Sequence, residues 1–407
     1  MVNAVFVAPY FATTTLRFID AAASLPDVRL GLVSEDPEQK LPAELRHKLA
    51  AHYRVEDGLT ANGLRVAVEA MKVGLGSVDR LIGTLEQLQV PLGELRDELD
   101  LAGLRADAAR NFRDKAQMKT VLRAAGLPCA RHRLASQTAE VIAFVQEVGF
   151  PIIVKPPAGA GAQGTYRLDD GDALTSCLSS MPPTPERPVL VEEFIAGEEH
   201  SFDSVVLGGH VVWHSINDYT PAPIEVLRHP WIQWSVLSPR EVDDPAYAPI
   251  RDVAEPALKV LGLHDGLSHM EWFRREDGRI AISEVGARPP GAQFATLLSY
   301  AYDFDFYRAW AELMVRDVWE PPPRQYAVGA VYLRAQGKGE RIGAVHGLAE
   351  AQREVGELVV EAKLPREGQA PSGTYEGDGY VILRHPETAT VRDALRRLVE
   401  RIYVELS

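Results

Sequence analysis

Residues 269–291, HMEWFRREDGRIAISEVGARPPG, constrain the fold of this chain more than any other stretch. Hydrophobic residues on both sides of Asp277-Gly278 suit β-strands, and Asp-Gly is a typical two-residue hairpin turn. The stretch therefore predicts two antiparallel strands joined by a tight turn.

The register that this turn sets brings two glutamates together. With Asp277-Gly278 as the turn, Glu271 faces Glu284 on one side of the sheet. Opposed like charges destabilise a strand pair, and a cation between them removes the conflict. Mg²⁺ takes one or two carboxylates together with substrate phosphate oxygens. The pair therefore fits a metal site, and the alternative is an exposed hairpin with two solvated glutamates.

Composition narrows the function classes. The chain has 407 residues and a formal net charge of −14, which favours roughly two to four soluble domains and disfavours general binding to nucleic acid or anionic membrane. A local basic pocket stays compatible with that charge. We find no apolar run long enough for a membrane span and no signal peptide. Cys129 and Cys177 are the only cysteines, which predicts a cytoplasmic protein without a disulfide framework.

The N-terminal region alternates strands and helices. Strand-like runs at 4–9, 28–33 and 78–83 are separated by helical segments such as 14–25, which predicts parallel βαβ units. The first strand leads into Pro-Tyr-Phe at 9–11 rather than into a glycine-rich turn. We therefore expect a scaffold with no cofactor there.

Further along, two stretches carry distinct expectations. Residues 111–126 are predicted to form one helix that ends at Gly126. Residues 216–245 are rich in proline and aromatic residues and are predicted to be irregular.

A glycine-rich segment matches G-x-G-x-x-G at Gly159, Gly161 and Gly164. A dinucleotide site needs such glycines to open a helix, whereas here they join two strand-like runs. The segment therefore predicts a hairpin tip whose backbone N–H groups can approach phosphates. Lys155 ends the preceding strand, where it can neutralise the same phosphates. The alternative is a surface turn.

Three further sites are weaker when taken alone. Lys115 begins a helix in the pattern D-K-x-x-x-K, where a lysine is most often solvated. Glu192 and Glu193 close a strong strand, whose end could bind a base, and Glu199 could bind a ribose hydroxyl. Acidic residues at a strand end more often face solvent.

Two residues flank the glutamate pair. His269 lies two residues before Glu271 and therefore points to the same face, although a core histidine is the commoner case. Arg288 follows Glu284 by four residues and could hold a carboxylate or an acyl phosphate by bidentate hydrogen bonds. Its alternative is a surface salt bridge.

The order of these motifs resembles the ATP-grasp superfamily. Most of the chain is covered, and GLSHME at 266–271 with EVGARPPG at 284–291 is most similar to the bacterial L-amino acid ligase, or dipeptide synthetase, branch of carboxylate–amine ligases. The resemblance implies an α/β fold, α+β in the catalytic part. The implied domains are an N-terminal Rossmann-like parallel-sheet domain at 1–112 and a small mobile ATP lid at 113–195. A catalytic subdomain at 196–320 and a C-terminal subdomain at 321–407 follow.

The resemblance also implies a role for each site residue. Lys115 and Lys155 would contact ATP phosphates beneath a flap from Gly159 to Gly164 that includes Gly161. Glu192, Glu193 and Ile195 would line the adenine, and Glu199 would hold the ribose. Glu271 and Glu284 would bind Mg²⁺, or Mn²⁺ in its place. Arg288 would stabilise charge on the transferred group, and His269 would lie near an amino acid substrate.

The implied activity is ATP-dependent amide formation between a carboxylate and an amine, both small molecules and at least one an amino acid. Gly286 stands where many members have an asparagine ligand, which leaves the number of metal ions open. A homodimer is a family expectation. Two alternatives stay open: a carboxylating or ribonucleotide-type enzyme similar to biotin carboxylase, and a nucleotide-binding regulatory protein without turnover.

The substrate pocket is the least defined part. Residues 216–236 are our candidate for part of it, and packing of their aromatic residues into a core is the alternative. The side chains concerned are Tyr219, Arg228, His229, Trp231 and Trp234.

Overall fold

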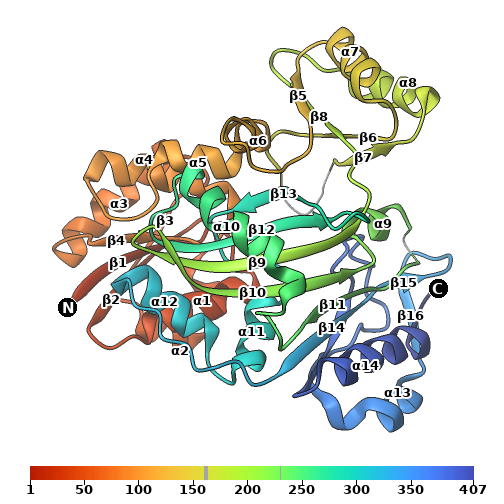
Figure 1. Cartoon of the computed structure of the whole chain (residues 1–407). Helices are drawn as coiled ribbons and strands as arrows, with labels where there is room; N and C mark the ends of the chain where they lie inside the picture. The colour runs from red at the N-terminus through yellow and green to blue at the C-terminus, as the bar shows by residue number, and fades with distance from the viewer. Residues whose placement is uncertain (160–163, 230) are drawn as a thin grey trace.

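The computed structural model describes residues 1–159, 164–229 and 231–407. Four sheets organise the chain, and Figure 1 shows how they are arranged. The N-terminal domain packs beside a large central sheet, a small lobe stands above that sheet, and the C-terminal segment flanks its far edge.

The N-terminal sheet has the predicted parallel arrangement, in the order β3-β2-β1-β4. Its central strand is buried from Ala4 to Val7 because helices cover the sheet. The elements of this domain are β1 (Val2–Val7), α1 (Thr13–Ala23), β2 (Val28–Ser34), η1 (Glu38–Lys40), α2 (Ala43–Lys48), β3 (Ala51–Arg54), α3 (Ala61–Leu75), β4 (Arg80–Ile82), η2 (Glu86–Leu88) and α4 (Gln89–Leu99).

The single helix predicted for 111–126 is wrong, because the chain breaks at Asp114. Helix α5 (Ala106–Arg113) ends there and α6 (Lys115–Ala124) begins. The Asp114 backbone is extended, and its carboxylate accepts hydrogen bonds from the backbone N–H groups of Ala116 and Gln117 at 2.8 and 2.9 Å. An aspartate in this position caps a helix, and it places Lys115 in the first turn of α6.

The small lobe, at the top of Figure 1, holds a sheet with the order β5-β8-β6-β7. Its strands β6 and β7 pair antiparallel, with Ile152 opposite Leu168, as the glycine-rich hairpin predicts. The tip, 160–163, lies outside the described residues, and with it the predicted Gly161. The elements are β5 (His132–Ala135), α7 (Thr138–Val148), β6 (Ile152–Lys155), β7 (Tyr166–Leu168), α8 (Gly171–Ser180) and β8 (Val189–Glu193).

The central sheet is antiparallel and has the order β13-β12-β9-β10-β11-β14-β18-β17. It continues past residue 321, so C-terminal strands complete the sheet that carries the hairpin. Its strands are β9 (Glu198–Leu207), β10 (His210–Thr220), β11 (Trp234–Ser238), β12 (Gly266–Arg274), β13 (Ile280–Gly286), β14 (Ala327–Leu333), β17 (Val359–Lys363) and β18 (Gly379–His385).

The prediction that 216–245 is irregular is wrong for most of that stretch. It holds the end of β10, a short helix α9 (Pro223–Arg228) and β11, which pairs with β10 and β14. Strand β11 is buried along its whole length. Ser235 and Ser238 are buried together with the apolar residues of β11, so the stretch lacks the regular alternation of a half-buried strand.

The hairpin of β12 and β13 has the predicted pairing at its functional end, with Glu271 opposite Glu284. The turn itself differs from the prediction. Arg275 pairs with Arg279 across a three-residue loop, and Gly278 takes φ +80°, which glycine adopts without strain. The register shifts after Glu271, and Ser283 is the extra residue of this β-bulge. The bulge restores the register that the longer loop would have displaced.

The two faces of the sheet around the hairpin differ in character. Met270 and Trp272 point into a core that α10 (Ala248–Leu261) covers. Since successive residues alternate between faces, His269 and Glu271 point to the opposite face. The hairpin therefore buries one side and offers polar groups on the other.

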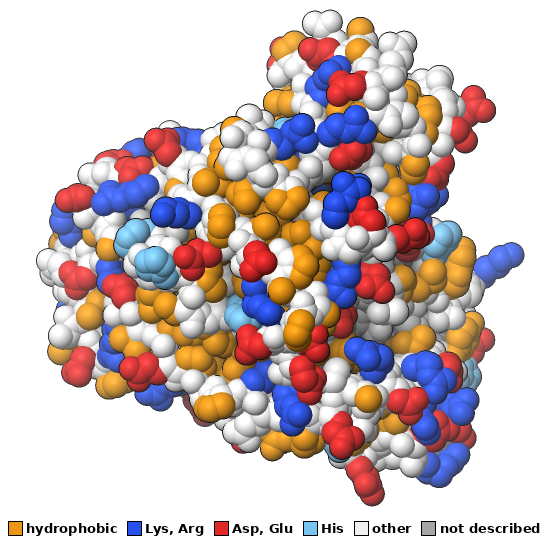
Figure 2. All heavy atoms as spheres, in the orientation of Figure 1, with side chains coloured by type: hydrophobic (Ala, Val, Ile, Leu, Met, Phe, Trp, Pro, Cys, Tyr) orange, Lys and Arg blue, Asp and Glu red, His pale blue; other side chains and the backbone are white. Residues whose placement is uncertain are grey.

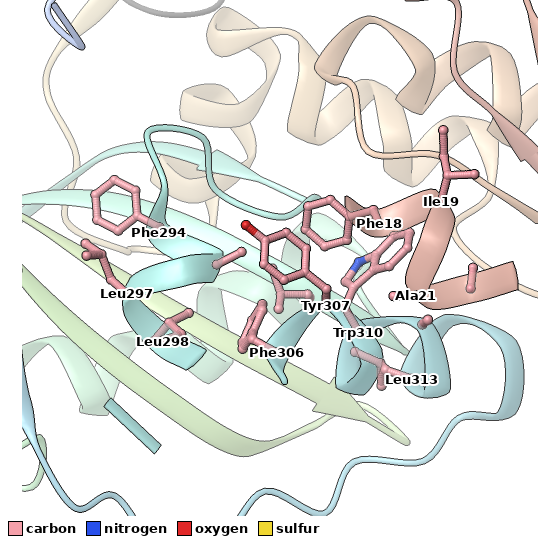
Figure 3. Packing of buried hydrophobic residues seen from close by; sticks show 14 of the residues in the cluster. Phe18, Ile19, Ala21, Phe294, Leu297, Leu298, Phe306, Tyr307, Trp310 and Leu313 are labelled. Atoms are coloured by element: carbon pink, nitrogen blue, oxygen red, sulfur yellow. The ribbon is translucent and has the colours of Figure 1, made fainter. Parts of the chain in front are cut away.

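A second core joins the N-terminal domain to the central sheet (Figure 3). The Phe18 ring of α1 packs edge-on against Tyr307 and Trp310, with ring centroids 4.7 and 4.8 Å apart. The remaining elements are η3 (Pro245–Tyr247), α11 (Phe294–Tyr302), α12 (Phe306–Arg316), β15 (Ala335–Gln336), β16 (Ile342–His346), α13 (Leu348–Val355), η4 (Gly356–Leu358), α14 (Thr388–Arg401) and β19 (Tyr403–Leu406).

Basic and acidic side chains are interspersed on the face that Figure 2 presents. Among the described helices, none has the length and apolar character needed to cross a bilayer.

Candidate functional site

A cavity of about 590 Å³ lies where the N-terminal domain, the lobe and the central sheet meet. Every described residue that the sequence nominated as a site residue except Gly164 lines it. These residues are Lys115, Lys155, Gly159, Glu192, Glu193, Ile195, Glu199, His269, Glu271, Glu284 and Arg288.

One wall of the cavity is a face of carboxylates. Glu271 lies opposite Glu284, and Phe273, two residues further along β12, lies opposite Glu199. Because residues two apart share a face, the three carboxylates lie on the same side of the sheet. Burial raises the pKa of Glu199 well above its ordinary value, and the charges of Glu271 and Glu284 raise it further.

His269 lies on the same face and is fixed by a buried aspartate. Its Nδ1 is 2.6 Å from Oδ1 of Asp203, and its Nε2 is 3.6 Å from Oε1 of Glu271. Asn217 donates to the second oxygen of Asp203 at 2.8 Å. Burial alone would lower the pKa of His269, but the two carboxylates outweigh it and raise the pKa to about 9.

Two buried lysines share one glutamate at the base of the lobe. Glu192 lies 3.1 Å from Nζ of Lys155 and 3.4 Å from Nζ of Lys119. Lys119 also donates to the backbone carbonyl of Ser283, the bulge residue, at 2.7 Å. Burial alone would raise the pKa of Glu192, but the two lysines lower it below its ordinary value. The carboxylate thus neutralises the lysines, and its contribution to an adenine site stays a prediction.

Lys115 connects the glycine segment to the carboxylate face. Its Nζ is 2.8 Å from Oε1 of Glu284 and donates to the carbonyl of Gly159 at 3.0 Å. Arg113 donates to the same carbonyl at 3.2 Å. Burial alone would raise the pKa of Glu284, but Lys115 and Lys155 lower it below its ordinary value. Gly164 lies in the turn that precedes β7, away from the cavity lining.

The end of β8 forms another part of the wall. Glu193 accepts a hydrogen bond from Nε of Arg131 at 2.9 Å and lies 3.8 Å from Arg275. Ile195 is buried against Ala130 and Ala281. Ile195 thus presents an apolar surface to the cavity, as an adenine site requires, while the Glu193 carboxylate is engaged by arginines.

Arg288 is held by a residue of the N-terminal domain. Its Nε lies 2.5 Å from Oε2 of Glu86, which is only 6% exposed, and its Nη1 donates to the carbonyl of Pro289 at 2.8 Å. The N-terminal domain therefore supplies part of the site, in addition to the scaffold role predicted for it.

Sequence reasoning missed four residues of this arrangement: Glu86, Lys119, Asp203 and Tyr375. Lys119 is the second lysine of D-K-x-x-x-K, and its place one turn after Lys115 could have revealed it. Asp203 follows Glu199 at the even spacing of one strand face. Glu86 and Tyr375 carry no local signal, because only the fold brings them to the cavity.

The predicted substrate segment, 216–236, agrees in part with each of its two interpretations, a pocket wall and a packed core. Tyr219 and Trp234 line the cavity and also belong to the core, so both interpretations apply to them. Arg228 instead pairs with Asp169 of the lobe at 3.1 Å, and Trp231 is 59% exposed. Arg228 and Trp231 are not among the residues that line the cavity.

The carboxylate face fits a hard divalent cation. Within the described residues, no group of three or more histidine, cysteine, aspartate or glutamate side chains has the geometry of a complete metal site. Two opposed glutamates are what Mg²⁺ commonly takes from a protein when phosphates and water supply the remaining oxygens. The pair Glu271 and Glu284 therefore fits the protein's share of such a site.

Comparisons with known proteins agree with this geometry. Residues 120–301 match the ATP-grasp domain family. The chain is 26% identical over 278 residues to an L-arginine-specific L-amino acid ligase of Bacillus subtilis, an alignment that covers 67% of this chain and 66% of that protein. The chain thus spans slightly less than two thirds of the length of this relative.

Solved structures share the fold over the full chain. The L-amino acid ligase from Bacillus licheniformis superposes with a TM-score of 0.78 at 18% identity and covers 100% of this chain and 99% of that one. N5-carboxyaminoimidazole ribonucleotide synthetase from Thermotoga maritima gives a TM-score of 0.70 at 15% identity and covers 100% of both chains. Residues 120–301 therefore form an ATP-grasp domain, the full chain shares the fold of the solved structures, and the relatives named here are ligases and a synthetase.

Proposed function

We propose that this protein is an ATP-dependent carboxylate–amine ligase that joins amino acids through an acyl phosphate. The observation that carries the proposal is the convergence in one cavity of two opposed glutamates, buried lysines and Arg288. This set can neutralise a triphosphate and a developing acyl phosphate at the same place. The name of the Bacillus subtilis relative supports an amino acid as substrate.

The first step transfers the terminal phosphoryl group of ATP to a substrate carboxylate. A carboxylate oxygen attacks the γ-phosphorus, the bond to the bridging oxygen breaks, and ADP leaves. Lys115 and Lys155 are the residues that would hold the phosphate oxygens, and Arg288 would stabilise the charge on the transferred group. Glu271 and Glu284 would hold Mg²⁺, or Mn²⁺ in its place, which supplies charge neutralisation at the phosphates.

The second step forms the amide. The neutral amine of a second substrate attacks the carbonyl carbon of the acyl phosphate, the bond to the phosphate oxygen breaks, and inorganic phosphate leaves. The amine loses a proton in this step, and the departing phosphate can accept it. The protein supplies no covalent nucleophile, so its contribution is positioning and exclusion of water. We propose that the lobe and the Gly159–Gly164 segment close over the nucleotide as a lid.

Assignment of the nucleotide contacts follows from position. Ile195 and the end of β8 would line the adenine, and Glu199, buried on the carboxylate face, would accept a hydrogen bond from the ribose. Glu192 and Glu193 are committed to basic side chains, so they would contribute through their backbone. The predicted homodimer, the cytoplasmic location and the domain boundaries at 112, 195 and 320 stay predictions.

A phosphate-release screen over pairs of amino acids, with mass spectrometry of the products, tests the proposal. We expect ADP, phosphate and a dipeptide in equal amounts for at least one pair. ATP turnover that depends on bicarbonate and needs no amine would instead support a carboxylating enzyme, such as the one named for the Thermotoga maritima structure. ATP binding without turnover across the whole panel would support a regulatory protein.

A further inference from the structure

Beyond the carboxylate face, the cavity continues into a distal end built from aromatic residues. We define this distal end by Tyr219, Trp234, Phe294, Tyr375 and Glu376, all of which line the cavity. Phe294 links it to the reaction end, because its ring centroid is 5.8 Å from that of His269.

The aromatic rings form a continuous wall. The Tyr219 ring lies 5.5 Å from Trp234 and 6.0 Å from Phe294, and Tyr375 packs edge-on against Trp234 at 4.9 Å. Burial raises the pKa of Tyr375 above its ordinary value, and the charge of Glu376 raises it further, followed by that of Glu271. The Tyr375 hydroxyl therefore lies within electrostatic range of both Glu376 and Glu271.

The loop that carries Tyr375 and Glu376 is fixed by a buried arginine. Arg334 is 5% exposed, and its guanidinium donates to the carbonyls of Thr374, Val226 and Ile232 at 3.1, 2.7 and 3.0 Å. One side chain thus ties the loop to α9 and to the segment before β11, and Ile224 of α9 lines the cavity.

Glycine completes this anchoring. Gly377 follows Glu376 with φ +64°, and a Cβ there would come within 2.4 Å of the carbonyl oxygen of Leu333. Only glycine fits this position without strain. The backbone next to Glu376 is therefore set in one conformation by packing.

Glu376 is the charged group of the distal end, and it has no cationic partner there. Among the residues that the structure describes, no lysine, arginine or histidine lies within ion-pair distance of its carboxylate. Glu376 keeps contact with solvent, yet partial burial raises its pKa, and only the backbone of Ala292 opposes that rise. Glu199 on the carboxylate face likewise has no ion-pair partner among the described residues, whereas Glu192 and Glu284 each pair with a lysine.

From this arrangement we infer that the distal end binds the cationic side chain of an amino acid substrate, with Glu376 as the residue that selects it. The inference rests on the proposed function, because it assigns a substrate class to that same cavity. A positive group placed against aromatic faces and one carboxylate gains cation–π and charge-assisted hydrogen-bond energy together. A neutral side chain of the same shape would gain neither.

The test compares substrates that differ only in charge. Lysine and norleucine form one matched pair, and arginine and citrulline form another. We expect the wild-type enzyme to use the cationic member with a kcat/KM at least about tenfold higher, and Glu376→Gln to reduce this ratio by ~10–100-fold. Glu376→Asp retains the charge and should retain most of the preference. Glu367→Gln, an exposed glutamate of the same loop outside the cavity, is the matched control and should leave the ratio unchanged.

Two results would overturn the inference: equal use of both members by the wild type, or an equal loss for both in Glu376→Gln. If no pair of amino acids is ligated, the proposed function fails, and calorimetric titration then decides the inference separately. With ADP and Mg²⁺ present, lysine should bind more tightly than norleucine to the wild type and equally to Glu376→Gln. Equal affinities in the wild type would refute the distal site as well.

Discussion

Two glutamates of one cavity, Glu284 and Glu376, have opposite electrostatic settings. Lys115 and Lys155 approach Glu284, and its pKa is lowered although burial would raise it. Glu376 has no such neighbour, and burial raises its pKa. The protein therefore pairs Glu284 with cations at the reaction end and leaves Glu376 without an ion pair at the distal end. An unbalanced carboxylate costs free energy until a ligand of opposite charge arrives.

The largest effect on activity is expected from removing a carboxylate at the reaction end. Glu284→Ala should lower the rate of ADP formation by ~1,000-fold or more, because a metal held by two glutamates loses one of them and Lys115 loses its partner. Steady-state ADP release measures the loss, and circular dichroism checks that the fold is intact. Glu276→Ala, in the exposed turn of the same hairpin, serves as the control.

An active Glu284→Ala enzyme would show that the hairpin has no part in nucleotide chemistry. Slow activity restored by raising the Mg²⁺ concentration would still agree with a metal role, since weaker binding can be offset by mass action.

Charge balance at the reaction end also predicts an effect on stability. Glu192→Gln should lower the free energy of unfolding by about 3–5 kcal/mol, because removing the shared carboxylate leaves Lys119 and Lys155 buried without a counter-charge. Urea unfolding at equilibrium measures the change. Lys72→Met, on an exposed face of α3, should change the free energy of unfolding by less than about 0.5 kcal/mol. Equal changes in both variants would mean that the buried pair is energetically neutral.

A smaller effect should come from the contact between the N-terminal domain and Arg288. Glu86→Ala removes the acceptor that orients the guanidinium, so kcat should fall by ~10–100-fold while KM for ATP changes little. Glu86→Gln keeps an acceptor oxygen and should recover part of the rate. Glu69→Ala, an exposed glutamate of the same domain, is the control. A rise in KM with unchanged kcat would point to a binding role for this contact.

The smallest expected effect is a change in stability on substitution of Glu376 at the distal end. Folding raises the pKa of the Glu376 carboxyl. The folded protein therefore loses stability as the pH rises through the unfolded and then the folded pKa of this group. Glu376→Gln should therefore be slightly more stable than the wild type at pH 7, by less than about 1 kcal/mol because the group is partly solvated. The difference should vanish near pH 3, where both side chains are neutral. Thermal unfolding across this range measures it, and a variant less stable at pH 7 would contradict the assignment.

Local patterns predicted the reaction end well, because its residues lie on regular strands and on one helix start. The pairing of Glu271 with Glu284 is confirmed even though the predicted turn is wrong, since the loop and the bulge displace the register in opposite directions. The antiparallel pair β6–β7 around the glycine segment is likewise confirmed.

Long-range contacts escaped prediction for a physical reason. The Glu86–Arg288 pair joins positions 202 residues apart, and neither side chain signals the other in the sequence. The break at Asp114 was missed because helical periodicity continues on both sides of it, while the capping carboxylate decides where the helix starts. The distal end was only half recognised, because Tyr375 and Glu376 come from a loop far from Tyr219 and Trp234.

The bulge at Ser283 links the length of the turn to the pairing of Glu271 with Glu284. The number of residues between the turn and Glu284 must keep the same parity, because each single-residue shift turns a strand over. An insertion of one residue in the 275–279 loop would be tolerated only if the bulge were lost at the same time. In related sequences, a turn that is one residue longer or shorter should therefore occur together with a change in the bulge. The glutamate pair would then stay in place.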